Sequence, residues 1–415
     1  MKLKILPLIT LLISSTASAG DDMANSQKIL EMDLTSGKGM NPEGSIVVQI
    51  HPTDDETDAE LEAKASALIE YENADVIDAV STEAEEIKKI KVEIGADHDP
   101  RNYPKFLASV FTLDFSNPLI PVENIVDGGV VVDEISTLVN PLVIPIKEAQ
   151  EYLHFNDDEY MAVVEINGDA RAYPLSVLNW HQGVNDEIGG QPVFVVYDPL
   201  SGNVVAIDRR VAGKKETTFG VTGQVYKSAS LYYDRATKSV WSAFENMAIS
   251  GSLSGKRMVK YDAVLTTWKE FTSLYPQGVV LDMMNTGYER NYRQNPYGDY
   301  AKNNEILFKV PYANETFRRK EYMIGMRLYK GSRRIEAVVP VNTLINYKQD
   351  KVDMMFEQVD GVGFQQVPLT FEVKKPYGTI KVSSSDVDVR IETFYGYWFV
   401  WSAYNPNSRL IKTLD

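Results

Sequence analysis

The sequence predicts an α+β protein with a β-rich main unit from about residue 115 and an acidic, more helical segment before it. Residues 21–100 hold 21 acidic and 6 basic residues, whereas residues 101–415 hold 37 and 34. Apolar residues before Pro104 recur at helical spacing, and after it they form short β-branched and aromatic runs between glycine turns. This change in composition predicts the boundary between the two parts.

The first 19 residues are typical of a secretory signal. Lys2 and Lys4 precede an apolar run over residues 5–13, and Ala17-Ser18-Ala19 offers a cleavage site before Gly20. The run is too short to cross a bilayer. We therefore expect an exported protein, periplasmic or secreted, without a transmembrane segment. A short buried N-terminal helix is the alternative.

Residues 20–114 form the acidic N-terminal segment. Residues 45–50 are typical of one strand, and residues 54–94 carry apolar side chains at the spacing of helices with one apolar face. Acidic runs are usually solvated helical faces. A surface that binds cations or a basic protein partner is the alternative interpretation.

Charge and cysteine content exclude several functions. The net charge is −16, which excludes nucleic acid as a partner because a polyanion does not follow phosphates. Cysteine is absent, so there are no disulfides, thiolate metal sites or cysteine nucleophiles. The four histidines lie far apart in sequence: His51, His98, His154 and His181. We therefore predict that the protein holds no transition metal, and we expect no other cofactor.

Turn residues define the elements of the main unit, residues 115–415. Asn167-Gly168 predicts a hairpin between strands over 160–166 and 169–173. Two more strand pairs flank turns at 199–202 and 235–238, and Pro174 begins a short helix expected over 175–182. A second helix is expected over 266–275.

Two parts of the main unit share an ordered series of short matches. Glu159-Tyr160-Met161 recurs as Glu321-Tyr322-Met323, and Trp241-Ser242-Ala243 recurs as Trp401-Ser402-Ala403. In each part a turn glycine and a strand that ends in proline lie between these matches. The series predicts a degenerate duplication with lobes over 159–250 and 321–405.

Longer motifs carry a resemblance to a known family. They include residues 166–175 (INGDARAYPL), 179–181 (NWH), 197–202 (YDPLSG), 219–223 (FGVTG), 290–300 (RNYRQNPYGDY) and 397–401 (YWFVW). In this order they resemble the family known as domain of unknown function 3179, over roughly residues 115–412. The resemblance implies Cys-Pro-Leu-Cys-Gly where this chain has Asp198 and Ser201, and often His-Glu where it has His181-Gln182. Soft-metal chemistry is therefore disfavoured here, which leaves a hard cation or no metal.

The chemically capable residues form two groups. His181, Asp186 and Asp198 are the candidate catalytic residues, and Asn185 follows His181 by four positions, which would place both on one helical face. The candidate ligand-binding residues are arginines and tyrosines suited to an anionic or sugar-like molecule: Arg209, Arg235, Arg290, Tyr292, Arg293 and Tyr297. A buried structural histidine and turn-forming Asp-Arg pairs are the alternatives.

Two hypotheses for function follow. The first is a non-enzymatic binding or scaffold protein for an unknown small polar or anionic ligand, in which the replaced cysteines mark a lost site. The second is an enzyme with a pocket around His181. It requires His181, Asp186 or Asp198, and one of the arginines to meet in one concavity.

Overall fold

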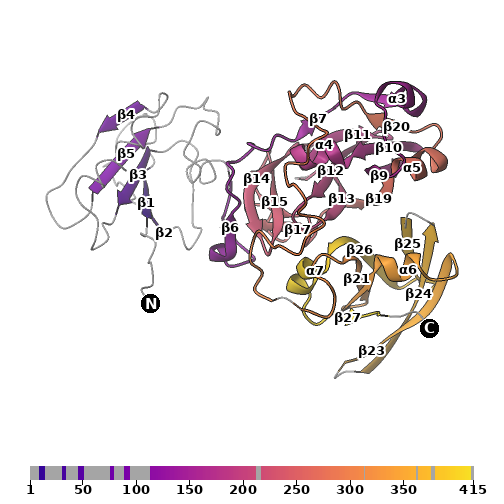
Figure 1. Cartoon of the computed structure of the whole chain (residues 1–415). Coiled ribbons are helices and arrows are strands. Elements are labelled where there is room, and N and C mark those ends of the chain that lie inside the picture. Colours follow the sequence, from indigo (N-terminus) through magenta and orange to yellow (C-terminus); the bar gives the residue numbers. More distant parts are fainter. Residues whose placement is uncertain are drawn as a thin grey trace.

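The computed structural model describes residues 113–211, 216–312, 314–360, 363–374 and 379–412, together with five short strands nearer the N-terminus (Figure 1). These five strands form one sheet in the order β2-β1-β3-β5-β4. They are β1 (Ile9–Ser14), β2 (Leu30–Asp33), β3 (Ser45–Ile50), β4 (Asp75–Asp78) and β5 (Lys88–Glu93).

The N-terminal strands confirm one expectation and correct another. The strand over 45–50 is present as β3. Helices were expected over 54–94, and this is wrong for β4 and β5. The alternation of Ile90 and Val92 with lysine and glutamate has a period of two, and these residues pair with Val48 and Ile46 of β3. Residues 54–74 lie outside the described part, and the signal and its cleavage before Gly20 stay predictions.

From residue 113 the described chain is β-rich, as expected, and folds into five small sheets in a propeller-like ring (Figure 1). Three sheets belong to the first half of this unit and two to the second half.

The first half contains three five-stranded sheets. One has the order β19-β9-β10-β20-β8, the next β18-β13-β12-β11-β7, and the third β17-β16-β15-β14-β6. Their strands are β6 (Ile125–Asp127), β7 (Leu138–Val139), β8 (Val143–Pro145), β9 (Tyr160–Ile166), β10 (Asp169–Pro174), β11 (Gly183–Ile188), β12 (Gln191–Asp198), β13 (Asn203–Asp208), β14 (Phe219–Tyr226), β15 (Ala229–Asp234), β16 (Val240–Ser242), β17 (Met247–Ser250), β18 (Lys260–Tyr261), β19 (Ala263–Thr267) and β20 (Val279–Leu281).

The second half contains a four-stranded sheet, β26-β21-β22-β27, and a three-stranded sheet, β23-β24-β25. Their strands are β21 (Tyr322–Lys330), β22 (Arg333–Pro340), β23 (Lys351–Asp360), β24 (Gly363–Lys374), β25 (Thr379–Ser383), β26 (Val389–Tyr397) and β27 (Arg409–Leu410).

Helices in the described part are short, and no helix there is long and apolar enough to cross a membrane. Thr267 caps one of them by accepting a hydrogen bond from the amide of Glu270. The helices are η2 (Val122–Asn124), α3 (Ile146–Tyr152), α4 (Leu175–His181), α5 (Trp268–Leu274), α6 (Val341–Ile345) and α7 (Trp398–Tyr404).

The predicted turns hold. Ile166 pairs with Asp169 across a two-residue turn in which Asn167 and Gly168 both have positive φ, as a type I′ hairpin requires. The strand pairs around 199–202 and 235–238 are β12-β13 and β15-β16. Both predicted helices are present as α4 and α5.

The two lobes share their first part and differ in their last. In each, an antiparallel hairpin ends at a proline, Pro174 or Pro340, which begins a short helix. This supports the repeat. The Trp-Ser-Ala match does not extend to structure, because Trp241 lies on β16 and Trp401 lies on α7. Both side chains are buried, as is Trp398.

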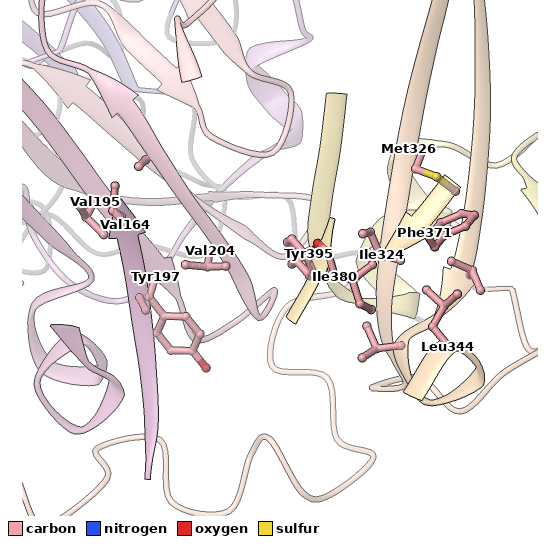
Figure 2. Close-up of a cluster of buried hydrophobic side chains, with 14 of the residues drawn as sticks. Val164, Val195, Tyr197, Val204, Ile324, Met326, Leu344, Phe371, Ile380 and Tyr395 are labelled. Carbon is pink, nitrogen blue, oxygen red and sulfur yellow. Dashed lines mark hydrogen bonds between the residues drawn. The ribbon is translucent and has the colours of Figure 1, made fainter. Parts of the chain in front are cut away.

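The largest apolar cluster joins the two halves (Figure 2). Val164, Val195 and Val204 contribute from the first half, and Ile324 and Phe371 contribute from the second. Strand β13 also lies against β26, and the side-chain amide of Asn203 donates to the main-chain carbonyl of Tyr395 at 2.9 Å. The turn at 199–202 therefore sits where the halves meet.

Candidate functional site

Helix α4 ends at the residues that the motif analysis singled out. Gln182 takes a left-handed conformation with a φ of 53°, and its amide donates to the carbonyl of Leu178. The chain then reverses into β11, while the carbonyl of Gln182 accepts from the amide of Tyr197 at 3.2 Å. This contact places the end of α4 beside the end of β12, where Asp198 lies.

His181 is buried, with 1% of its surface exposed. Its Nδ1 lies 2.7 Å from the carbonyl of Ser136, and its Nε2 lies 2.8 Å from the hydroxyl of Tyr292. A carbonyl only accepts, so Nδ1 carries the proton and Nε2 accepts from Tyr292. Burial lowers the pKa of His181, the Ser136 carbonyl opposes this, and the charge of Arg290 lowers the pKa further.

Replacing His181 with glutamine is expected to lower the free energy of unfolding by about 1–3 kcal/mol near pH 8, because its hydrogen bonds are buried. Since the pKa of His181 is lowered in the native protein, the unfolded chain binds this proton first as pH falls below about 6.5. The wild type should therefore lose stability between about pH 6.5 and the lowered pKa, and the His181→Gln variant should lose less.

Urea unfolding of both proteins near pH 8 and near pH 5 measures this difference. His154 is exposed, and His154→Gln is the matched control, whose free energy of unfolding should stay within about 0.5 kcal/mol of the wild type. An equal acid-induced loss in the wild type and in His181→Gln would contradict the assignment of that loss to His181.

Asn185 and Asp186 do not line a site with His181, which corrects the expectation of a shared helical face. Helix α4 ends at His181, and both residues lie on β11. The side chain of Asn185 is buried and bonds the amide and the carbonyl of Phe219, which links two sheets. These bonds connect β11 to β14.

The carboxylate of Asp186 is held by two side chains of β10. Arg171 donates to it at 2.9 Å, and the hydroxyl of Tyr173 donates at 2.7 Å. Arg209 donates to the main-chain carbonyl of the same aspartate. The Asp186 network is therefore a structural connection between β10, β11 and the end of β13.

The four candidate arginines do not converge. Arg209 is buried and bonds carbonyls of Asp186 and Thr217, and Arg235 pairs with Asp133 at 2.7 Å. Arg290 is exposed and lies over the ring of Trp180 at 5.7 Å, and Arg293 is also exposed. Only Arg290 acts on His181, through its charge.

Asp198 is a buried carboxylate with four hydrogen-bond donors. One oxygen accepts from the amide of Leu200 at 3.1 Å and the hydroxyl of Ser230 at 2.8 Å. The other accepts from the hydroxyl of Ser201 at 2.5 Å and the amide of Ser230 at 3.0 Å. Burial raises the pKa of Asp198, and the bonds from Ser201 and Ser230 oppose that effect.

The tyrosines of the stretch 290–300 form hydrogen bonds to other parts of the protein. Tyr292 bonds His181, the hydroxyl of Tyr297 accepts from the side-chain Nε2 of Gln182 at 2.6 Å, and Tyr300 donates to the carbonyl of Leu200 at 3.1 Å. The three tyrosines thus cover the end of α4 and the 199–202 turn.

Gly202 shows how closely this turn is packed. Its φ is 68°, and a Cβ there would lie 3.0 Å from the ring of Tyr397. The amide of Tyr397 also donates to the carbonyl of Ser201 at 2.7 Å. Both the conformation and the close approach of Tyr397 favour glycine at this position.

Sequence reasoning missed several residues around Asp198. Ser228, Ser230 and Tyr232 are all buried, and they alternate along the chain into β15. Polar residues that alternate on a strand usually face solvent, so this pattern gave no signal of a buried polar face. We use the name Asp198 cluster for Gln182, Asp198, Ser201, Ser230, Tyr232 and Tyr297.

The described residues contain no group of three or more His, Cys, Asp or Glu side chains that could hold a metal ion. His181 has no carboxylate hydrogen-bonded to it, and its two ring nitrogens bond Ser136 and Tyr292. The side chains near Asp198 also carry oxygen atoms, in amide and hydroxyl groups, that could serve as metal ligands. Such oxygens are hard ligands.

Comparison with known proteins gives a family but no described relative. No curated protein and no solved structure matches the chain. The model of the family described as protein of unknown function DUF3179 matches residues 132–408. This range contains α4, the 199–202 turn and the tyrosines that cover them, so the chain belongs to the DUF3179 family.

Proposed function

We propose that this chain is an exported, non-enzymatic binding protein for a small polar or anionic ligand. The observation that carries the proposal is the separation of the reactive side chains. His181, Asp186 and Asp198 each belong to a different hydrogen-bond network. General acid-base catalysis needs such groups within reach of one substrate.

The exposed face beside α4 supports binding. Arg290 and Arg293 are exposed, and Trp180 and Tyr288 present aromatic surface close to Arg290 and His181. Tyr288 is 41% exposed. A guanidinium next to aromatic rings binds carboxylates, phosphates and sugar-like molecules without any reaction. We call Trp180, Tyr288, Arg290 and Arg293 the arginine face.

The test begins with the full chain expressed in a bacterium. The proposal expects the protein in the periplasmic or secreted fraction, with a mass that starts at Gly20. The purified protein is then titrated with citrate, inorganic phosphate, glucuronate and glucose in a calorimeter and in a thermal melt. We expect one class of compound to raise the melting temperature and to be recovered unchanged.

The double variant Arg290→Ala, Arg293→Ala should lose that response, because both charges leave the arginine face. Arg334→Ala is the matched control, since Arg334 is also exposed but pairs with Glu336 on β22. A response that survives in the double variant would contradict binding at this face. Conversion of the bound compound that stops in His181→Gln would favour the enzyme hypothesis instead.

A further inference from the structure

The Asp198 cluster gathers buried polar side chains whose hydrogen bonds to one another leave some of their polar atoms unpaired. On β12, residues at alternate positions share a face, which places Phe194 and Asp198 on one side. The same rule places Ser230 and Tyr232 together on β15. The rings of Phe194 and Tyr232 lie 5.6 Å apart, and Ser230 bonds Asp198. The two faces are therefore opposed, with Tyr232 directed toward the side of Asp198.

Gln182 and Tyr297 approach Asp198 from the α4 side. They bond each other at 2.6 Å, and the carbonyl of Gln182 bonds the amide of Tyr197, next to Asp198. The charge of Asp198 raises the pKa of both Tyr232 and Tyr297, after the larger effect of burial, and the pKa of Tyr297 reaches about 12. Electrostatic coupling and geometry thus place these groups around one carboxylate.

Two buried atoms of the cluster lack a hydrogen-bond partner within the described part of the chain. They are the Gln182 Oε1 and the hydroxyl of Tyr232, on side chains 2% and 1% exposed; the Ser230 side chain is near enough to the Tyr232 hydroxyl to affect its pKa but does not meet the geometry of a hydrogen bond. Exchanging the oxygen and nitrogen of the Gln182 amide leaves one of its atoms unpaired as well. Buried polar atoms are nearly always paired with protein, water or an ion.

Charge gives a second reason to expect a bound species. Among the described residues, no lysine or arginine forms an ion pair with Asp198. Its four hydrogen-bond donors are neutral amides and hydroxyls. A buried carboxylate without a counter-charge is costly, and a cation nearby offsets part of that cost.

We propose that the Asp198 cluster binds a monovalent cation, Na⁺ or K⁺, through the oxygens of Gln182, Tyr232 and Tyr297. These donors are hard and neutral, and Asp198 supplies one negative charge. Divalent ions generally take several carboxylate ligands, and this cluster has one, whose oxygens already accept four bonds. The site is separate from the arginine face and does not depend on the proposed function.

The test compares thermal melts of the full chain in NaCl, KCl and choline chloride at one ionic strength. We expect a higher, saturable melting temperature in NaCl or KCl than in choline chloride, because a ligand that binds only the native state stabilises it. Tyr232→Phe and Gln182→Leu should remove the difference. Tyr226→Phe removes a phenol from β14 outside the cluster and should keep it.

If the variants do not fold, binding can be measured directly on the wild-type protein by sodium NMR. The sodium NMR line of the wild-type protein should broaden on binding and sharpen when K⁺ displaces Na⁺. Equal melting in all three salts, with no broadening, would show that the cluster holds water only and would overturn the proposal. A salt response that persists in folded Tyr232→Phe and Gln182→Leu would overturn it equally.

Discussion

Replacing Asp198 with alanine is expected to lower the free energy of unfolding by about 3–5 kcal/mol. The change leaves two main-chain amides and two hydroxyls without their acceptor at a buried position. It also removes the carboxylate that ties the 199–202 turn to β15. Urea unfolding monitored by tryptophan fluorescence measures the loss.

Asp157→Ala is the matched control. Asp157 is 71% exposed at its side chain and pairs with Lys269, so its loss should cost at most about 1 kcal/mol. Similar losses in the two variants would contradict the structural importance of Asp198.

The pH dependence of the Asp198 variant has a defined sign. Burial raises the native pKa of Asp198 above its unfolded value, so protonation of this group favours the native state. That contribution is present below the unfolded pKa and is lost as pH rises through the raised native pKa. The stability difference between the wild type and Asp198→Ala should therefore be larger at acid pH than near neutrality, if both are folded there.

Replacing Arg327 with methionine is expected to cost about 2–4 kcal/mol. Arg327 is 1% exposed and pairs with Glu245 at 3.2 Å, while it also donates to the side-chain oxygen of Asn405. Its guanidinium lies over the ring of Phe394 at 4.5 Å. Methionine fills a similar volume but leaves the carboxylate and the amide oxygen without this donor.

Arg327→Lys separates charge from shape. Lysine keeps the positive charge but cannot donate to two acceptors in one plane. We therefore expect Arg327→Lys to be less stable than the wild type and more stable than Arg327→Met. Arg334→Ala, at an exposed pair on the next strand, should change stability by at most about 1 kcal/mol. Calorimetric melting temperatures rank the three variants, and a wild-type value for Arg327→Met would contradict the prediction.

Local signals predicted much of the fold. Asn167-Gly168 has the conformational freedom that a type I′ turn needs, and the hairpin of β9 and β10 follows from it. Pro174 fixes the backbone at the start of α4 in the same way that Pro340 does at the start of α6. Such features depend on neighbours in the chain and can be recognised without tertiary contacts.

The predictions were wrong where the spacing of residues fitted both a helix and a strand. Ile87 and Ile90 fit a helix, whereas Ile90 and Val92 fit a strand, and pairing with β3 favours the strand. The spacing of His181 and Asn185 fits a helix as well. The left-handed turn at Gln182 ends α4 before Asn185, and the next sheet takes the following residues into β11.

Local sequence patterns were sufficient to predict the β-rich character of the main unit, its turns, its short helices and its family. Tertiary structure alone decided which of the reactive residues meet. His181 faces Tyr292, and Asp186 faces Tyr173. Asp198 faces Ser230. These partners lie between 13 and 111 residues away along the chain, and their contacts arise from how the sheets pack, which no local pattern encodes.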